Sequence, residues 1–452
     1  MPATTDQNVI DGSPTKEFFI YMLVRDIPLN RAVIDLIDNS VDGARRIRDG
    51  ARFNELWIRL DIGKDRFRIC DNCGGIPVNI AREYAFRFGR PKEAPAIDGS
   101  IGQFGVGMKR SFFKMGTRLD IESTTSTSKF TIEVDANEWK ERKLENGEED
   151  WHFQFSSLSE NIVVPVEEQG TTITVTGLHS SVAESFSLES VIKQLGQEVA
   201  VAHAESMDKG LSISINGIPL RHEPMCFLHS DSIKPAHVVI TYETPNGKPV
   251  HVKLYAGVAD HSKEEGGWYV FCNGRLIVRA DQSSLTVWGE DDRVPKYHPN
   301  FARFRGLAYF DSDDSSLLPW TTTKTGVDSD SPVYRAIRQQ MIELTRPVLE
   351  FLRKLEDERK KLADGDIPSD PLALAVASAE PINTPELVSH AIFLAPSPPP
   401  LPPGPRMQRI QYSKPADLVE KAKLLLGSTS FTGVGEKTFE YYMKYEGCEN
   451  AP

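Results

Sequence analysis

Hydrophobic residues recur with helical spacing near the start of the chain and with strand-like alternation after it. Ile34, Ile37 and Val41 stand three and four residues apart, which predicts a helix over residues 15–48. Alternating stretches separated by turn residues then predict antiparallel strands. The expected strands are 56–62, 66–70, 119–123, 129–134, 151–155 and 172–176, and further helices are expected at 108–115 and 188–207. This mixed order predicts an α/β sandwich in which helices cover one face of a sheet.

A second α/β region is expected after the first. Its strands are predicted at 211–215, 237–242, 250–255 and 267–272, with tight Asn-Gly turns at 216–217 and 273–274. A helix over 334–362 comes next, and Pro347 should interrupt it because proline lacks the amide that a helix needs. The domains expected from these patterns are 17–207, 208–335, 336–363, 364–405 and 406–447.

The C-terminal part of the chain is predicted to be a linker followed by a small segment. Residues 364–405 are rich in proline, alanine and serine, a composition that stays semi-extended and does not pack a core. A docking site for a proline-binding domain, at the run after Pro396, is the alternative. A strand at 409–412 and helices at 415–426 and 435–445 follow, resembling a ribbon-helix-helix unit. This segment is too short to bury a core alone, so it is expected to become stable by pairing. Its basic residues are few and are balanced by acids, so dimerisation is favoured over DNA reading.

Composition narrows the class of protein. The 452 residues exceed one ordinary core, so two or three domains are expected. The net charge of −12 argues against an overall basic field that recruits nucleic acid. No apolar run is long enough to span a membrane, and the first residues lack the features of a signal peptide. The five cysteines are scattered, so neither a disulfide framework nor a zinc site at Cys70 and Cys73 is expected, and the cytoplasm is the natural location.

Polar residues on one face of the first helix are candidates for chemistry. Asn39 lies four residues after Asp35, so the two side chains share a helix face. The amide oxygen of Asn39 is a suitable magnesium ligand, and Asp35 is a candidate general base. Asp42 is placed to support the water shell of the metal or to orient a neighbouring cation.

Two further stretches supply candidates for binding a flat base and phosphates. Asp71 ends a strand and precedes Gly74 and Gly75. A carboxylate there can accept a hydrogen bond from an exocyclic amine, and glycine lets the backbone approach a base closely. Residues 102–107 contain three glycines just before a helix, where backbone N–H groups and the helix dipole form an anion cradle. Lys109 adds positive charge beside this cradle.

Taken in order, the stretches 35–42, 71–76, 102–109 and 170–172 resemble the four motifs of the GHKL ATPase superfamily. The superfamily is named for DNA gyrase, the heat-shock chaperone, histidine kinases and the mismatch-repair clamp. The glycine-rich stretch resembles that of the chaperone, whereas the second motif and the Lys324 segment resemble the mismatch-repair and MORC-like branches. The resemblance implies a Bergerat-type α/β sandwich, a transducer-like second domain, and ATP and Mg²⁺ as cofactors.

The resemblance also implies roles for individual residues. Asn39 would bind magnesium, and Asp71 would bind the adenine amine with Thr171 or Thr172 nearby. Lys324 would reach the γ-phosphate from the second domain. The remaining expected nucleotide contacts are Asp42, Gly75, Ile76, Gly102, Gln103, Phe104, Gly105, Val106, Gly107, Met108 and Lys109.

Asp35 stands where the hydrolytic branches of the superfamily usually have glutamate. The shorter side chain loses about 1.5 Å of reach, and a misplacement of that size costs about a hundredfold in rate. Asp35 and Lys324 are therefore the expected catalytic residues of a slow ATPase, a homodimeric clamp or switch linked to DNA or to defence in a prokaryote. The alternative is a chaperone-like or non-hydrolysing ATP-gated scaffold that acts on protein partners.

Overall fold

The chain folds into two compact units, residues 1–397 and 398–452, in a computed structural model. The described residues are 14–25, 27–48, 52–89, 100–102, 105–245, 247–290, 293–364, 366–383, 390–397, 410, 412–428 and 430–446. Both extended sheets belong to the larger unit. No helix within the described ranges has the length and apolar character needed to cross a bilayer.

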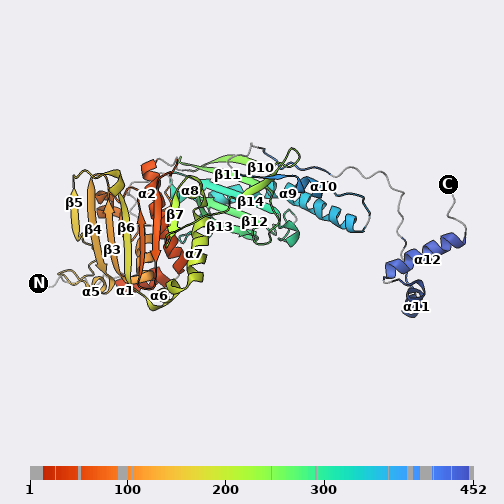
Figure 1. Ribbon diagram of the computed structural model, residues 1–452, viewed down its shortest axis with the longest axis horizontal. Coiled ribbons are helices and arrows are strands. Elements are labelled where there is room, and N and C mark those ends of the chain that lie inside the picture. The colour runs from red at the N-terminus through yellow and green to blue at the C-terminus, as the bar shows by residue number, and fades with distance from the viewer. Residues whose placement is uncertain are drawn as a thin grey trace, which may run out of the picture. The chain divides into compact units, whose positions relative to one another are not determined.

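An eight-stranded sheet forms the first half of the larger unit (Figure 1). Neighbouring strands are antiparallel except β1 and β7, which run parallel. In spatial order the strands are β5 (Ser157–Glu160), β4 (Ser128–Asp135), β3 (Gly116–Thr124), β6 (Gly170–Leu178), β2 (Arg66–Asp71), β1 (Trp57–Ile62), β7 (Ser212–Ile215) and β8 (Ile218–Pro219). With its helices, this sheet confirms the α/β architecture expected from the sequence.

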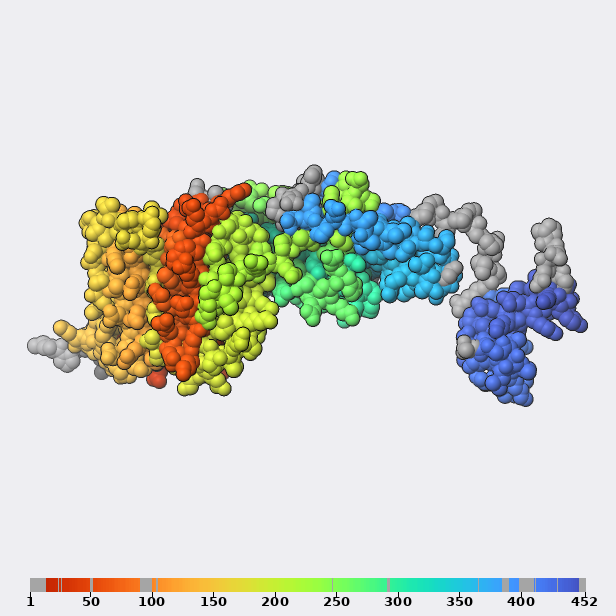
Figure 2. All heavy atoms as spheres, viewed as in Figure 1, coloured from red at the N-terminus to blue at the C-terminus, as the bar shows by residue number. Residues whose placement is uncertain are grey.

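The helices of the first half surround a core centred on α2. Val33 and Ile34 of α2 are fully buried, and α2 packs beside α7, as Figure 2 shows for the red-orange and yellow-green segments. The single helix predicted over 15–48 is two helices, because Pro28 has no amide N–H and disfavours a helical conformation at Ile27. The helices are α1 (Lys16–Arg25), α2 (Leu29–Arg48), α3 (Val78–Ile80), the π-helical turn Ala81–Ala85, α4 (Gly107–Met115), α5 (Ala136–Glu141), α6 (Ser180–Ser187), and α7 (Glu189–Ala202) and α8 (Ala204–Asp208), which divide the helix expected at 188–207.

Two expected strands differ in the structure. Residues 151–155 form no strand. Trp151 and Phe153 pack on Trp139 instead, with the Phe153 ring stacked on it at 5.2 Å, and Phe155 packs on Phe130. The strand expected at 211–215 as the first of the second region is β7, which pairs with β1. The first sheet therefore continues past the boundary predicted at residue 207.

A five-stranded sheet forms the second half of the larger unit (Figure 1). Only β12 and β14 are parallel, and every other neighbouring pair is antiparallel. In spatial order the strands are β10 (Ala236–Glu243), β11 (Pro249–Val258), β14 (Phe304–Asp311), β12 (Gly267–Cys272) and β13 (Arg275–Asp281). A separate two-stranded ribbon joins β9 (Cys226–His229) to β15 (Glu380–Asn383).

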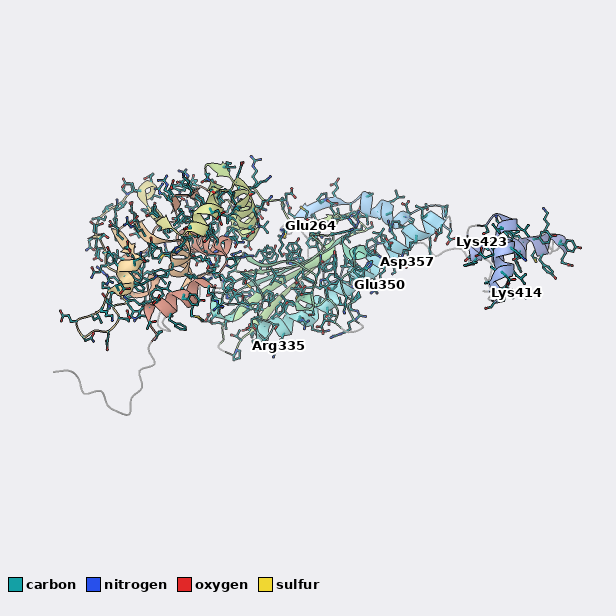
Figure 3. The ribbon with its side chains drawn as sticks, turned by 90° about the horizontal axis from the view of Figure 1, so that it is seen from below. Glu264, Arg335, Glu350, Asp357, Lys414 and Lys423 are labelled. Atoms are coloured by element: carbon teal, nitrogen blue, oxygen red, sulfur yellow. The ribbon has the colours of Figure 1, made fainter. Side chains whose placement is uncertain are left out.

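Helix α9 (Pro332–Asp364) packs on the second sheet along its length. Tyr334, Met341 and Val348 are fully buried along its inner side. The charged side chains on its outer surface include Arg335, Glu350 and Asp357 (Figure 3). The helix continues through Pro347, so the predicted interruption is wrong. Proline costs about 3 kcal/mol in a helix interior, and burial of the turns on both sides of Pro347 offsets that cost.

The expected linker contains ordered structure before residue 398. Helix α10 (Pro371–Ala377) packs on α9, where the Glu358 carboxylate accepts hydrogen bonds from the backbone N–H of Leu372 at 3.1 and 3.0 Å. Strand β15 pairs with β9, and Phe393 is buried. The prediction that residues 364–405 do not pack a core is therefore wrong for this part, and the following proline run lies outside the described residues.

The smaller unit contains helices α11 (Ala416–Leu426) and α12 (Phe431–Tyr445) in its described residues. Val434 is the one buried side chain in that described part. Helix α12 begins four residues before the expected start, after Ser430, whose hydroxyl accepts the N–H of Gly433 as an N-cap. The strand expected at 409–412 falls partly outside the described residues.

Candidate functional site

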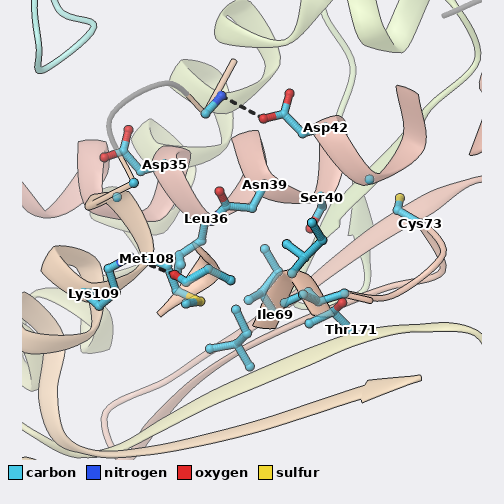
Figure 4. Close-up of a pocket in the computed structure, with 18 of the residues that line it drawn as sticks. Asp35, Leu36, Asn39, Ser40, Asp42, Ile69, Cys73, Met108, Lys109 and Thr171 are labelled. Carbon is cyan, nitrogen blue, oxygen red and sulfur yellow. Dashed lines mark hydrogen bonds between the residues drawn. The ribbon is translucent and has the colours of Figure 1, made fainter. Parts of the chain in front are cut away.

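A cavity of about 220 Å³ lies beside α2 in the larger unit (Figure 4). Its walls come from α2, from β2 and β6 and the loop after β2, from the glycine-rich segment with α4, and from residues 322 and 324 of the second region. The expected site residues that line it are Asp35, Asn39, Asp42, Asp71, Gly75, Ile76, Gly102, Gly105, Val106, Gly107, Met108, Lys109, Thr171 and Lys324. Gln103 and Phe104 lie outside the described residues.

Asn39 presents its side chain to the cavity from the middle of α2 (Figure 4). It is exposed, whereas Asp38 and Ser40 beside it are buried. Within the described residues its amide forms no hydrogen bond. A Cβ added to Gly102 would lie 3.9 Å from its Oδ1, so the start of the glycine-rich segment passes close to this oxygen. The amide is therefore available to a ligand in the cavity.

Asp35 forms a buried ion pair with Arg110 of α4. The Arg110 Nε donates to Asp35 Oδ2 at 2.9 Å, and a terminal nitrogen of the same guanidinium donates to the same oxygen. Both side chains are under 10% exposed, and a buried ion pair of this kind is costly to break from one side. The second oxygen of Asp35, Oδ1, is the one left for a further partner.

Asp42 holds the start of the glycine-rich segment. Its carboxylate oxygens accept the backbone N–H groups of Ile101 and Gly102, each at 2.7 Å. Burial raises the pKa of the Asp42 carboxyl, and the charge of Arg45 and these two N–H groups oppose that rise. Asp42 thus connects the helix that carries Asn39 to the segment that faces it.

Asp71 lies at the end of β2 with its carboxylate in a polar pocket. Its Oδ2 accepts from Ser40 Oγ at 2.6 Å, and its Oδ1 accepts from the N–H of Cys73 at 2.9 Å and of Thr171 at 3.3 Å. Burial raises the pKa of the carboxyl, and these hydrogen bonds oppose that rise only in part. An ionised carboxylate has about four acceptor positions, so three are occupied and one remains.

Backbone contacts fix the loop after Asp71. Gly75 has a φ of +68°, and a Cβ there would lie 2.1 Å from the Thr124 carbonyl oxygen, so only glycine fits. Ile76 N–H donates to Ser123 Oγ at 2.7 Å. Of the two threonines expected near Asp71, Thr171 lines the cavity and Thr172 does not, because successive strand residues face opposite sides of a sheet.

Lys109 is a buried cation at the cavity wall near the start of α4. It is 4% exposed, and its Nζ donates to the Ala85 carbonyl at 2.8 Å. Burial lowers the pKa of the ammonium to about 7. No carboxylate of the described residues forms an ion pair with it. An anion in the cavity would therefore find a cation whose charge is not yet neutralised.

Lys324 reaches the cavity from the second region, as expected, but its partner is Asp38. Its Nζ donates to Asp38 Oδ2 at 2.8 Å, and Arg275 Nε donates to Oδ1 at 3.0 Å. Burial opposes ionisation of Asp38, but the charges of Lys324 and Arg275 outweigh it and hold its pKa well below the usual range. Neighbouring His203 is fully buried, which lowers its pKa to about 3 and keeps it neutral.

Several residues of the site were missed from the sequence. Ser40 stands out in the sequence only as a poor helix former beside Asn39 inside an apolar helix, and Arg110 only as a possible added charge on a helix, where arginine is usually solvated. Asp38 follows Asp35 by three residues and lies near the same helix face. Its partners Lys324 and Arg275 lie far along the chain, so helix spacing alone does not reveal its role. The cavity residues not expected from the sequence include Ser40, Arg46, Tyr84, Arg110 and Thr322.

Comparison with known proteins agrees with this arrangement. Residues 27–162 match the family model described as histidine kinase-, DNA gyrase B-, and HSP90-like ATPase, and no curated protein sequence matches the chain. The matched residues contain Asn39, Asp71 and the glycine-rich segment, whereas Thr171 and Lys324 lie beyond them. The N-terminal part of the chain, residues 27–162, is therefore a GHKL-type ATPase domain.

Proposed function

We propose that the protein binds ATP with Mg²⁺ in this cavity and hydrolyses it slowly, as a dimeric clamp or switch. The observation that carries the proposal is the buried Asp71 carboxylate, which has one acceptor position left at the cavity wall. The family match of residues 27–162 supports the same ligand.

At the base end, Asp71 selects adenine through hydrogen-bond direction. Its remaining position accepts from the exocyclic amine of adenine, whereas guanine presents a carbonyl oxygen there, and two acceptors repel. Thr171 lies next to Asp71 across the β2–β6 pair and can complete the recognition. ATP is therefore preferred over GTP.

At the phosphate end, the donors of the cavity suit a metal-bound phosphate chain. Magnesium takes oxygen ligands and is usually held by one or two protein groups, phosphates and waters. Asn39 supplies one such oxygen, and no cluster of three acidic, His or Cys ligands occurs within the described residues, which fits this shared mode of binding. The N–H groups of residues 105–107, at the start of α4, and Lys109 face the same anion.

Hydrolysis requires Asp35 to act on a water while it stays paired with Arg110. Both bonds from Arg110 go to Oδ2 of the carboxylate, which leaves Oδ1 without a bond to the guanidinium. When bound, magnesium supplies charge neutralisation on the phosphates. Lys324 contributes by leaving Asp38 for the γ-phosphate, which costs the existing ion pair and favours slow turnover.

The smaller unit supports the dimeric part of the proposal. Its two helices expose large apolar side chains while burying one residue in the described part, and a second copy would cover them. The exposed side chains are Leu418, Leu424, Leu425, Phe431, Phe439, Tyr441, Tyr442 and Tyr445. The client of the clamp, DNA or protein, is set by surfaces other than this cavity.

A non-hydrolysing ATP-gated scaffold is the second candidate. The observation that favours it is the ion pair of Asp35 with Arg110, which occupies one oxygen of the only candidate base on this helix face. In that case ATP binding alone would drive the conformational change. Single-turnover hydrolysis measured with excess enzyme distinguishes the two, since a scaffold releases no phosphate.

The test of the ATP site is isothermal calorimetry with Mg-ATP and Mg-GTP on the full chain. We expect binding of ATP, little binding of GTP, and loss of ATP binding in D71N, whose amide offers an acceptor only in one of its two orientations. D120N serves as a control, because Asp120 lies on β3 outside the cavity. Equal ATP affinity of D71N and the unaltered protein would show that the base does not bind at Asp71.

A further inference from the structure

The turn between β12 and β13 reaches from the second sheet to residues 100–102, just before the glycine-rich segment. Asn273 and Gly274 form the turn, and both have positive φ angles. Although it lies in a turn, Asn273 is only 4% exposed. A Cβ on Gly274 would lie 2.9 Å from Glu205 Oε2 of α8, and β13 lies beside α8 (Figure 1). The turn is therefore packed tightly into the first half of the unit.

The side chain of Asn273 bonds in two directions. Its Nδ2 donates to the Ser312 carbonyl at 3.1 Å, and its Oδ1 accepts the Ser312 N–H at 3.0 Å. These bonds fix the amide to the end of β14. The same Nδ2 donates to the Ser100 carbonyl at 3.1 Å. One hydrogen bond of a rigidly held amide thus crosses to the first half of the unit.

Residues 100–102 are held from the opposite side by Asp42 of α2, through the Ile101 and Gly102 N–H groups. Ser100 and Ile101 are buried. The start of the glycine-rich segment therefore lies between α2 and the β12–β13 turn. Two residues after Asn273, Arg275 donates to Asp38 of α2, so the same hairpin contacts both the segment and the helix that carries Asn39.

We propose that Asn273 is a positioning residue of the nucleotide site, which holds the Ser100 carbonyl and so sets where the glycine-rich segment begins. The inference rests on the proposed function, because the segment matters to the nucleotide only if its N–H groups bind phosphate. Groups that bind phosphate act best when they are already in place. A shift of the second sheet would then alter phosphate binding directly, independently of Lys324.

A second Asn-Gly turn, at Asn216 and Gly217, provides a matched control. Asn216 has a φ of +50°, close to the +46° of Asn273. Its side chain also bonds to backbone, accepting from Ile62 N–H at 2.7 Å and donating to Ile62 O at 3.0 Å. These partners lie within the first sheet and outside the cavity. A glycine at either position keeps the turn conformation and removes only the side-chain bonds.

The experiment compares N273G with N216G in the full chain by two readouts. The first is amide hydrogen exchange of Ile101 and Gly102 without nucleotide. The second is the affinity for ATP relative to adenosine, which lacks phosphates. We expect exchange at these two amides to rise in N273G alone. We also expect N273G to bind ATP about tenfold more weakly, as for loss of one buried hydrogen bond, with adenosine affinity unchanged.

If Asn273 only stabilised the turn, N273G would weaken the affinities for ATP and for adenosine equally, or N273G and N216G would lower the affinity for ATP alike. Either result would overturn the proposal. Unchanged exchange at Ile101 and Gly102 in N273G would also overturn it. Failure of the unaltered protein to bind ATP would refute the proposed function. Amide exchange at Ile101 and Gly102 would still show whether Asn273 holds the start of the glycine-rich segment. If N273G folds poorly, N273D replaces it, because aspartate keeps the acceptor for Ser312 N–H and puts a second oxygen, which cannot donate to the Ser100 carbonyl, in place of the amide nitrogen; the same pattern is expected.

Discussion

Replacing Lys109 by methionine separates two effects of this buried cation: it lowers the stability of the fold, and it favours the binding of phosphate. Lys109 lies at the cavity wall with its Nζ 2.8 Å from the Ala85 carbonyl oxygen. Burial lowers the pKa of its ammonium from 10.5 to about 7. Methionine keeps the approximate length and the apolar contacts of the side chain, and it removes the charge together with the hydrogen bond to the Ala85 carbonyl. The pH dependence of stability then separates the ionisation of Lys109 from the loss of this bond, because only the ionisation varies with pH.

The pKa shift sets both the size and the sign of the expected effect. A shift of roughly 3.5 units corresponds to about 5 kcal/mol of stability lost when the buried amine must carry its proton. Below pH 7 the folded and unfolded chains both hold the proton, so the full cost is present. Between about pH 7 and 10.5 only the unfolded chain holds it, so stability rises with pH. Between pH 7 and pH 9 the expected rise in stability is about 2 kcal/mol.

Denaturant unfolding at pH 7 and pH 9 measures this rise in the absence of nucleotide. We expect K109M to have a higher free energy of unfolding than the unaltered protein at pH 7. We also expect K109M to lack the rise in this free energy that ionisation of Lys109 causes between pH 7 and pH 9. K114M is the control, because Lys114 lies on the same helix, outside the cavity, and also donates to a carbonyl, that of Val24. If stability depends on pH identically in K109M and the unaltered protein, the pKa of Lys109 is not lowered by burial as inferred.

Nucleotide binding should favour the charged form of Lys109, which burial alone disfavours. Phosphate beside Lys109 favours the ammonium, so ATP binding at pH 8 should take up a proton, and affinity should fall as pH rises above 7. Calorimetry in two buffers of different ionisation enthalpy counts this proton. K109M should bind ATP more weakly and take up none, while K114M should match the unaltered protein.

Three further predictions address the rest of the cavity and the smaller unit. D35N should keep ATP binding and lose turnover in a phosphate-release assay, whereas D35E should turn over faster than the unaltered protein. Turnover of D35N equal to that of the unaltered protein would show that another residue is the general base. G75A should lower the free energy of unfolding by more than about 2 kcal/mol, because its Cβ would overlap the Thr124 carbonyl at positive φ, and a shift under half that size would contradict this contact. Truncation after Ser397, which keeps β15 and Phe393, should give nucleotide-free monomers in light scattering; a stable dimer would place the contact in the larger unit.

The parts of the site that depend on chain-local chemistry could be predicted from the sequence. Asp71 follows a strand pattern and precedes two glycines, and its strand pairs with the one that carries Thr171. Asn39 and Asp35 share a helix face, which spacing alone reveals. These features depend on the geometry of single elements, so their residues could be assigned in advance.

The partners of these residues could not be predicted, because they depend on how distant segments meet. Asp38 looked like one acid among several on α2, yet it pairs with Lys324 and Arg275 of the second region. The strand at 211–215 fitted either region by its pattern, and only its pairing with β1 places it. Composition predicts a linker for the residues before 398, although α10 packs on the preceding helix α9 and β15 pairs with β9, far earlier in the chain.

The ribbon of β9 and β15 has a consequence for how the chain is made. Residues 226–229 leave the ribosome long before residues 380–383, with which they pair. Until then β9 presents an unpaired edge, which is prone to bind other chains. Because a contact between such distant residues also forms slowly, the nascent chain passes through a stage in which the strands of both large sheets have been synthesised while β9 still lacks its partner. Chaperones that cover strand edges would act at this stage of synthesis.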